Sequence, residues 1–373
     1  MIAIIGAGPA GARAAYLLAR RGAPVTIFDP SHPREKPCGG GVTGRALALV
    51  GDAIDPGAFP RTTIRAARFS REAIVDLDRD ALVVASRMAF DAALLDAAQR
   101  AGARLVRARV TDLSIGCDGV AIETSAGRFS AGFIVGADGA NSLVRRRVAS
   151  PFRRNQLSIA TGFFARGVTS AEIAIELTPR PPGYIWSFPR PDHLAIGICA
   201  QADAGISPAA LRARTASWIA TAGLADGARL EPYSWPIPSL SASDFERLSL
   251  AGPRWALTGD AAGLVDPITR EGIFLALAAG EWIADALSGD AAAAAYTSRV
   301  RDHAVPELRR AAQLKAGFFR PAFITLLLEA LRRSAAVRSV MADLVAGRQS
   351  YAQLKWRLIK TLEIALIWRA LTT

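Results

Sequence analysis

The opening of the chain alternates short apolar runs with one helical stretch. Residues 2–5 are all apolar, which is typical of a parallel strand buried on both faces. Small and apolar residues at helical spacing follow over 12–21, and Gly22 ends that predicted helix. A second apolar strand is predicted over 25–28. This order of strand, helix and strand predicts the first unit of a doubly wound α/β domain.

Two further strand-to-helix steps lie much later in the chain. A strand starting at Phe133 leads into a helix that begins near Asn141, and a strand starting at Trp255 precedes a helix over 272–287. Elsewhere the pattern changes to short strand-like runs, which predict an antiparallel sheet in a second domain. These runs cover 62–69, 73–77, 82–86, 157–168, 171–178, 184–189 and 193–200.

Turn and helix signals complete the pattern. Clusters of proline and glycine at 179–183 and 236–238 predict turns. A helix is predicted over 208–222, and the chain after Pro306 is predicted to be helical throughout. That last part contains a dense apolar patch formed by Phe318, Phe319, Phe323, Ile324, Leu326, Leu327 and Leu328.

The turn between the first strand and its helix has the spacing GxGxxG. Gly6 allows the tight turn, Gly8 lets the backbone approach a pyrophosphate, and Gly11 lets helix and strand pack closely. The free N–H groups and the dipole of the helix N-terminus attract phosphate. Asp29 ends the second strand, 18 residues past Gly11, where its carboxylate can accept hydrogen bonds from a ribose diol. These features predict a dinucleotide site, and the alternative is a glycine-rich packing turn.

Two later motifs distinguish FAD from NAD. The first motif starts with Gly-Ala-Asp-Gly, whose last residue is Gly139, and extends to Arg145. The second is the pair Gly259-Asp260. Together with GxGxxG they resemble the flavoprotein superfamily typified by para-hydroxybenzoate hydroxylase. The resemblance implies that Asp260 holds the ribityl chain of FAD and that Pro267 packs beside the flavin. The chain has no second GxGxxG and no CxxxxC pair, which argues against the disulfide reductases with two nucleotide domains.

Three stretches narrow the family. These stretches are Lys36-Pro37-Cys38-Gly39-Gly40-Gly41, then Tyr184-Ile185-Trp186-Ser187-Phe188-Pro189 followed by Gly197-Ile198-Cys199, and the Arg-x-x-Phe-Asp sequence from Arg87 to Asp91. They resemble the geranylgeranyl reductase family. The resemblance covers about residues 1 to 290. It implies that reduced FAD saturates C=C bonds of a prenyl chain by hydride transfer. The electron donor, either NAD(P)H or a reduced carrier protein, stays open.

The resemblance also implies a fold and a cofactor site. The expected fold is α/β: a Rossmann-like FAD-binding domain of the GR2 type (1–60, 87–150 and 250–290), an inserted antiparallel-sheet substrate domain (61–86 and 151–249) and a helical C-terminal region (291–373). The expected active site lies between the first two domains. The cofactor-binding candidates are Gly6, Gly8, Pro9, Ala10, Gly11, Asp29, Cys38, Gly39, Gly40, Arg87, Asp138, Gly259, Asp260, Pro267, Gly272 and Ile273.

The residue types support this interpretation. Tyr184, Trp186 and Phe188 alternate, so on a strand they share one face, and we expect them to bind an apolar substrate rather than serve only as core. Glycines 39–41 let backbone lie close to a flat ring. Cys38 is either a small buried residue or a neighbour of the flavin. Tyr184 or an ordered water is the candidate proton donor.

One position departs from the family pattern. Where the family has P-x-x-G-E-G-I, this chain has Pro267-Ile268-Thr269-Arg270-Glu271-Gly272-Ile273, with Arg270 in place of glycine. A guanidinium there would stabilise an anionic reduced flavin, bind an acidic group of the substrate, or point into solvent. With Cys38 and Tyr184, Arg270 completes the set of catalytic candidates.

Composition and charge add limits. The chain has 373 residues, 51% hydrophobic and 21% charged, which is typical of a globular protein that needs no disulfides. Three cysteines are too few for a disulfide scaffold and indicate a reduced, cytoplasmic setting. No secretory leader and no apolar run of spanning length is evident. The three histidines lack metal-ligand spacing, so no metal site is expected.

The net charge of +12 is concentrated at the end of the chain. Residues 301–373 hold thirteen basic residues against five acidic ones. No nucleic-acid motif accompanies them, so nucleic acid is not expected as a partner. Residues 354–371 combine tryptophan, Lys and Arg with apolar residues, which fits peripheral contact with the inner face of an anionic membrane. The alternative is packing against the FAD domain or a partner in a homodimer.

Two other functions stay open. A monooxygenase or a halogenase of the same fold shares the FAD motifs, and the Tyr184–Pro189 strand also resembles the WxWxIP strand of flavin halogenases. Halogenases need an active-site lysine outside the dinucleotide fingerprint, and Lys36 is the one lysine in the first 314 residues. This counts against halogenation but not hydroxylation. The other alternative is a flavin-binding protein without turnover.

Overall fold

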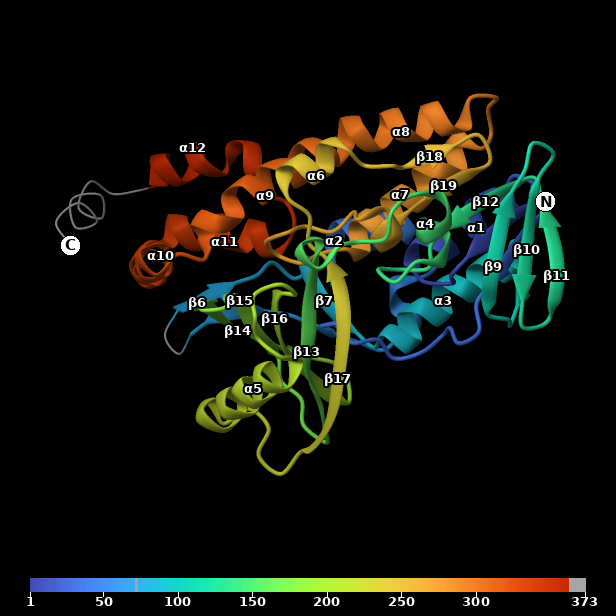
Figure 1. Ribbon diagram of the computed structural model, residues 1–373. Helices are drawn as coiled ribbons and strands as arrows, with labels where there is room; N and C mark the ends of the chain where they lie inside the picture. Colours follow the sequence, from blue (N-terminus) through green and yellow to red (C-terminus); the bar gives the residue numbers. More distant parts are fainter. Residues whose placement is uncertain (71–72, 362–373) are drawn as a thin grey trace.

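A mainly parallel sheet forms the first layer of the structure. The computed structural model describes residues 1–70 and 73–361 (Figure 1). The six strands lie in the order β18–β19–β12–β1–β2–β8, and all are parallel except β18. Their bounds are β1 (Ile2–Ile5), β2 (Val25–Phe28), β8 (Arg104–Val106), β12 (Phe133–Gly136), β18 (Ala251–Gly252) and β19 (Trp255–Leu257). The predicted Rossmann-like arrangement is confirmed.

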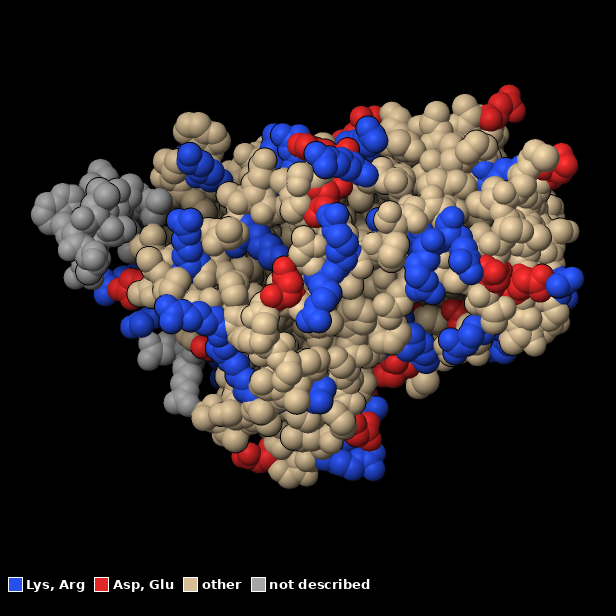
Figure 2. All heavy atoms as spheres, viewed as in Figure 1, with Lys and Arg blue, Asp and Glu red and all other residues tan. Residues whose placement is uncertain are grey.

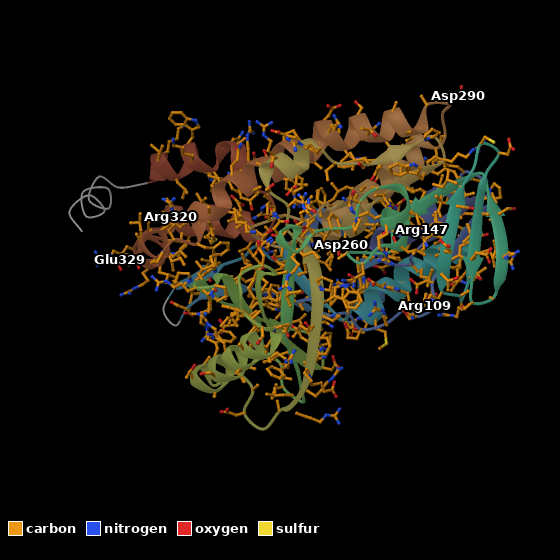
Figure 3. The ribbon with its side chains drawn as sticks, in the orientation of Figure 1. Arg109, Arg147, Asp260, Asp290, Arg320 and Glu329 are labelled. Atoms are coloured by element: carbon orange, nitrogen blue, oxygen red, sulfur yellow. The ribbon has the colours of Figure 1, made fainter. Side chains whose placement is uncertain are left out.

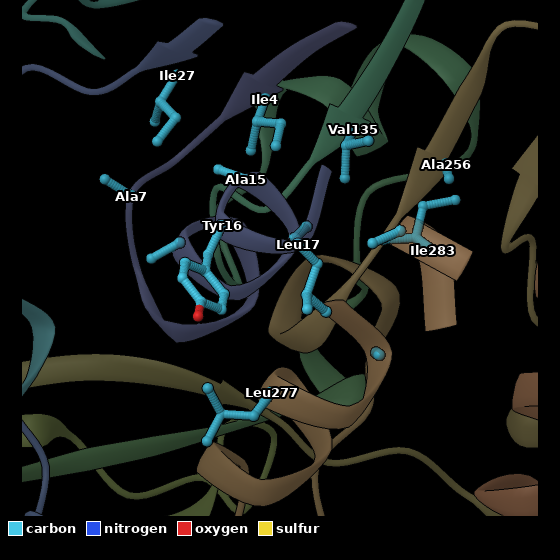
Figure 4. Packing of buried hydrophobic residues seen from close by; sticks show 14 of the residues in the cluster. Ile4, Ala7, Ala15, Tyr16, Leu17, Ile27, Val135, Ala256, Leu277 and Ile283 are labelled. Atoms are coloured by element: carbon cyan, nitrogen blue, oxygen red, sulfur yellow. The ribbon is translucent and has the colours of Figure 1, made fainter. Parts of the chain in front are cut away.

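Helices rich in small residues pack closely around this sheet. α1 (Pro9–Arg20) lies against both α3 (Arg87–Arg100) and α7 (Ile273–Ala286). Figure 4 shows Ile4, Ile27 and Val135 on the strands facing apolar residues of α1 and α7. Gly280 brings the two helices together, because a Cβ there would lie 2.5 Å from the carbonyl oxygen of Ala10. Two shorter helices, α2 (Gly44–Val50) and α4 (Leu143–Val148), complete this part.

A small antiparallel sheet at one end was not predicted. It consists of β9 (Val110–Ile115), β10 (Val120–Thr124) and β11 (Gly127–Ala131) in the order β11–β10–β9. Most positions of β9 are exposed, so few apolar residues marked the strand.

A seven-stranded sheet forms the second layer, in the order β17–β13–β16–β15–β14–β5–β6. Its strands are β5 (Ala66–Phe69), β6 (Ala73–Asp76), β13 (Leu157–Arg166), β14 (Glu172–Pro179), β15 (Pro182–Pro189), β16 (His193–Gln201) and β17 (Arg229–Pro238). All neighbours are antiparallel except β5 and β14. The predicted run 82–86 instead joins a separate sheet, β3 (Gly41–Thr43), β7 (Leu82–Ala85) and β4 (Arg61–Thr63).

The turn predicted at 236–238 is wrong, because these residues end the strand β17. Pro232, Pro236 and Pro238 pair with Phe163, Ile159 and Leu157 of β13. The three prolines occupy alternate positions on an edge strand, where a missing N–H on the unpaired side leaves the ladder intact. The turn predicted at 179–183 is confirmed, since β14 and β15 form a hairpin there.

Three of the remaining helices pack against the seven-stranded sheet. α5 (Pro208–Ala222) packs against β13 and β16, as predicted for 208–222. The helices α10 (Pro321–Arg333) and α11 (Ala335–Val345) pack against β6. The others are α6 (Ala242–Glu246), α8 (Ala292–His303), α9 (Val305–Phe318) and α12 (Tyr351–Thr361). The apolar patch around Phe318 therefore packs largely inside the protein.

Three short 3-10 turns, η1 (Pro56–Ala58), η2 (Arg154–Gln156) and η3 (Gly259–Ala262), complete the described elements. Within residues 1–70 and 73–361, no helix has the length and apolar character needed to cross a membrane. Trp368 and Arg369 of the predicted membrane-contacting segment lie outside the described residues.

Candidate functional site

The three glycines of the first turn have different surroundings. Gly6 has φ +104°, and a Cβ there would lie 2.4 Å from the carbonyl oxygen of Ala137. A Cβ on Gly11 would lie 2.0 Å from the carbonyl oxygen of Gly6. Gly8 is different, because its nearest neighbour would be the Lys36 Nζ at 3.8 Å. The fold itself therefore requires Gly6 and Gly11, whereas Gly8 leaves an open cradle that fits a dinucleotide phosphate.

This difference predicts separable effects of two substitutions. Gly8→Ala should leave the apoprotein's melting temperature nearly unchanged and weaken FAD binding about tenfold, because the new methyl group would occupy the phosphate cradle. Gly11→Ala should lower the melting temperature by several degrees, because the turn must open. Thermal unfolding of apoprotein and fluorescence titration with FAD measure both. Equal FAD affinity in wild type and Gly8→Ala would remove Gly8 from the cofactor site.

Asp29 ends β2 as predicted, but its carboxylate is already hydrogen-bonded within the protein. One oxygen accepts from the backbone N–H groups of Ser31 and His32, both at 2.8 Å. The other accepts from the Ala7 N–H at 2.9 Å and lies 2.8 Å from the His32 ring. Burial alone would raise the pKa of Asp29, yet the His32 bond and these amides bring it well below its ordinary value. A ribose-binding role for Asp29 stays a prediction.

The two other acidic candidates differ in position. Asp138 is half-buried and accepts from the Ser142 hydroxyl at 2.5 Å and the Leu143 N–H at 2.6 Å, so it holds the start of α4. Asp260, labelled in Figure 3, lies near the centre of the molecule in the wall of a cavity. Burial raises the pKa of Asp260, and the nearby cations of Lys36 and Arg87 oppose that shift. Asp260 is thus placed to accept hydrogen bonds from a polar ligand, and the role predicted for Asp138 remains untested.

A cavity of about 290 Å³ connects the dinucleotide turn with the seven-stranded sheet and the C-terminal helices. Most of the predicted site residues line it. They are Gly8, Pro9, Ala10, Cys38, Gly39, Gly40, Arg87, Tyr184, Trp186, Phe188, Gly259, Asp260, Arg270, Gly272 and Ile273. Gly6, Gly11, Asp29, Asp138 and Pro267 do not line it. The far end is apolar, with Phe69, Ile173, Ile175, Leu177, Phe318, Met341, Leu344 and Val345.

The three aromatic residues of β15 face this cavity together. The Tyr184 and Trp186 rings lie 5.7 Å apart, and Trp186 is buried against Gly197 of β16. The Tyr184 hydroxyl donates to the Thr269 carbonyl at 2.6 Å. Burial, and after it Cys199, raises the pKa of Tyr184 well above its ordinary value. Tyr184 therefore anchors the loop that carries Arg270, and its use as a proton donor stays a prediction.

The glycine loop 39–41 packs against Phe188 and Arg190. A Cβ on Gly39 or Gly41 would lie 3.0 Å from the Phe188 ring, and Gly40 has φ +86°. Arg190, which the sequence did not single out, is fully buried and donates to the Cys38 carbonyl at 2.5 Å, with longer contacts to the Lys36 and Gly39 carbonyls. Its guanidinium also forms an ion pair with Glu35. The turn between β15 and β16 of the seven-stranded sheet thus holds the loop that lines the cavity.

Lys36, His32 and Asp91 form a buried charged cluster around Arg87. The Arg87 guanidinium donates to both oxygens of Asp91 at 3.0 and 2.9 Å. His32 lies between Asp29 and Asp91. Burial lowers the pKa of Lys36, and the Arg87 charge lowers it further. No set of His, Cys, Asp and Glu within the described ranges is arranged to hold a metal ion.

The chain is similar to a known domain family and to several curated reductases. Residues 1–178 match the FAD binding domain family. The chain is 28% identical over 353 residues to the digeranylgeranylglycerophospholipid reductase of Methanothrix thermoacetophila, covering 86% of this chain and 87% of that one. It is 28% identical over 301 residues to the geranylgeranyl diphosphate reductase of Rhodobacter capsulatus, covering 76% and 73%. The menaquinone reductase of Mycolicibacterium smegmatis is 25% identical over 407 residues, with coverage of 99% and 95%.

Solved structures share the fold. A geranylgeranyl bacteriochlorophyll reductase-like protein from Thermoplasma acidophilum superimposes with a TM-score of 0.79 at 20% identity, covering 97% of this chain and 98% of that chain. A flavin-dependent halogenase has a TM-score of 0.67 at 20% identity, covering 96% and 76%. The fold and the site define an FAD-dependent oxidoreductase. Within that class the chain is similar to proteins named as geranylgeranyl reductases or as geranylgeranyl reductase-like, in agreement with the resemblance predicted from its sequence.

Proposed function

We propose that this protein reduces C=C bonds in the prenyl chain of an isoprenoid substrate. The cavity is the observation that carries the proposal: it runs from the open Gly8 cradle, past three aromatic rings, to an apolar end beneath the C-terminal helices. A long apolar chain gains free energy by leaving water for such a lining. Several relatives are named as reductases of geranylgeranyl compounds, which supports the same substrate class.

The chain's own residues bind, orient and exclude water. When bound, reduced FAD would supply a hydride to one alkene carbon, and Tyr184 or an ordered water would supply the proton for the other, while the protein orients and shields the reactants. Gly8, Lys36 and Asp260 would hold the cofactor's polar parts at one end of the cavity. Tyr184, Trp186 and Phe188 would hold the prenyl chain beside it. Because these walls are apolar, they would keep water from the reacting carbons. The electron donor is either NAD(P)H or a reduced carrier protein.

An anaerobic experiment tests the proposal. The FAD-loaded protein is photoreduced without oxygen, and a geranylgeranyl lipid is added. The oxidised-flavin absorption should then return, and mass spectrometry should find a product with two additional hydrogens. The second candidate is a monooxygenase or halogenase, because a halogenase shares the fold. In such an enzyme the flavin would stay reduced until oxygen is admitted. A flavin that stays reduced with every prenyl lipid would contradict the proposal.

We also propose peripheral membrane contact through α12. Tyr351 and Leu354 of this helix are buried against the protein, whereas Trp356 is 67% exposed and Ile359 is 44% exposed. Lys355 and Lys360 are exposed beside them. Figure 2 shows Lys and Arg distributed over the visible face, with fewer acidic side chains. The exposed side of α12 therefore combines an apolar group that can insert into a membrane with cations that attract anionic lipid.

A single substitution tests this contact. Trp356→Ser should reduce binding to anionic phospholipid vesicles several-fold, because indole is the largest apolar group on the exposed face. Met88→Ser removes another exposed apolar side chain, from α3, and should change nothing. Vesicle flotation measures both. Equal flotation of wild type and Trp356→Ser would contradict the role of α12.

A further inference from the structure

Two cations meet beside the cavity, and neither forms an ion pair with a carboxylate in the part of the chain that the structure describes. Arg270 donates to the Ser239 hydroxyl at 2.5 Å, and Lys315 of α9 donates to the same oxygen at 2.8 Å. Ser239 is buried, and its hydroxyl donates a hydrogen bond to the Gln201 side-chain oxygen at 2.9 Å. Lys315 also donates to that oxygen at 2.6 Å. Neutral oxygens alone therefore satisfy two adjacent positive charges.

Arg270 has unused donor capacity at the cavity wall. Its buried Nε has no hydrogen-bond partner among the described residues, although the side chain lines the cavity. Its backbone has φ +60°, a left-handed conformation that costs a non-glycine residue about 1 kcal/mol. A buried donor without a partner is also costly. The backbone strain and the unpaired donor both lower the stability of the protein. A ligand that binds Arg270 would offset these two costs.

Lys315 adds a charge that depends on its surroundings. Burial, and after it the Arg270 charge, lowers the pKa of Lys315 to about 7. Cys199 and the exposed Asp203 act in the opposite direction. An anion placed between Arg270 and Lys315 would favour the charged lysine, so binding would draw a proton from solution.

We propose that Arg270 and Lys315 form an anion site that takes the phosphate or carboxylate head group of the prenyl substrate. This inference rests on the proposed function and specifies the substrate: an acidic isoprenoid rather than a neutral one. Charge-assisted hydrogen bonds from a guanidinium and an ammonium suit such a group. With the head group at this site, the prenyl chain of the substrate would extend past Tyr184 and Trp186 toward the apolar residues of the cavity.

Calorimetric binding to the oxidised, FAD-loaded protein tests the site, using geranylgeranyl phosphate, geranylgeraniol and inorganic phosphate. Wild type should bind the phosphate ester about tenfold or more tightly than the alcohol. In Arg270→Gly and Lys315→Met that preference should fall to about twofold or less. Arg309→Gln removes an exposed charge from the same helix, α9, and should keep the wild-type preference. Arg270→Gly also removes the left-handed arginine, so a folding defect is not expected.

A proton measurement gives a second readout. At about pH 8, in buffers of different ionisation enthalpy, binding of the ester should take up protons in wild type but not in Lys315→Met. Equal affinity for ester and alcohol, an unchanged preference in both variants, or no binding of either would overturn the site. Inorganic phosphate that binds as tightly as the ester would assign the site to a free anion and overturn the head-group role. Anaerobic reduction of geranylgeraniol by Arg270→Gly tests the reductase separately from the anion preference.

Discussion

Arg190→Met should destabilise the protein by about 3–5 kcal/mol and reduce the amount of FAD that it retains. Arg190 is fully buried, and its guanidinium binds Glu35 and the carbonyl groups of the glycine loop. Methionine fills a similar volume but donates no hydrogen bond. Glu35 would then be a half-buried carboxylate without its cation. Urea unfolding measures the stability, and the ratio of flavin to protein absorption measures the retained FAD.

Two controls distinguish the buried charge from a general loss of arginine. Arg229→Met removes an exposed arginine paired with Glu231 in the same sheet and should cost less than about 0.5 kcal/mol. The double variant Arg190→Met with Glu35→Gln should recover about 1 kcal/mol or more, because the amide oxygen still accepts from the Arg87 N–H, the amide NH2 group can donate to the Ser86 hydroxyl, and no unpaired charge is left. A double variant no more stable than Arg190→Met would contradict this explanation.

The effect of Arg190 should also depend on pH. Burial raises the pKa of Glu35, but the Arg190 charge brings it below its ordinary value. A carboxylate with a lowered folded-state pKa stabilises the protein above its unfolded pKa and loses that contribution as pH falls through the folded value. The difference between wild type and Arg190→Met should therefore be largest near neutral pH and shrink below about pH 4.

Local patterns predicted those parts of the fold that depend on neighbouring residues. The GxGxxG turn, the buried parallel strands and the hairpin at 179–183 follow from backbone geometry and apolar periodicity, and all appear as expected. The prolines of β17 misled the prediction, because a proline cluster indicates a turn unless the strand lies at a sheet edge. Edge position follows from tertiary pairing, which the local pattern does not contain.

Long-range contacts explain the residues that the sequence did not reveal. Arg190 and Glu35 are 155 positions apart, and Lys315 reaches Gln201 from 114 positions away. Neither pairing leaves a periodic signal. One signal was available for the lysines: the chain has only four, and two of them, Lys36 and Lys315, are half-buried near the cavity. In a chain so rich in arginine, a retained lysine indicates a site where a compact charge or a shifted pKa is needed.

Under the proposed function, Val345→Trp should shift the preference of the protein from twenty-carbon to shorter prenyl substrates. Val345 is the last residue of α11 and lines the cavity together with Met341 and Leu344 of the same helix. An indole there would occupy the volume that the end of a long chain needs. The kcat/KM for a geranylgeranyl substrate should fall about tenfold to a hundredfold, whereas that for a geranyl substrate should change less than about threefold.

The opposite substitution at the same position supplies the control. Val345→Ala enlarges the cavity, so it should keep the twenty-carbon substrate and lower stability by only about 1 kcal/mol. The retained FAD should be equal in both variants, because Val345 lies at the end of the cavity remote from Gly8 and Asp260. If Val345→Trp loses both substrates equally while FAD stays bound, the prenyl chain does not extend toward α11. The length of the cavity would then not determine which chains the protein accepts, and the substrate would have to lie on the Tyr184 side alone.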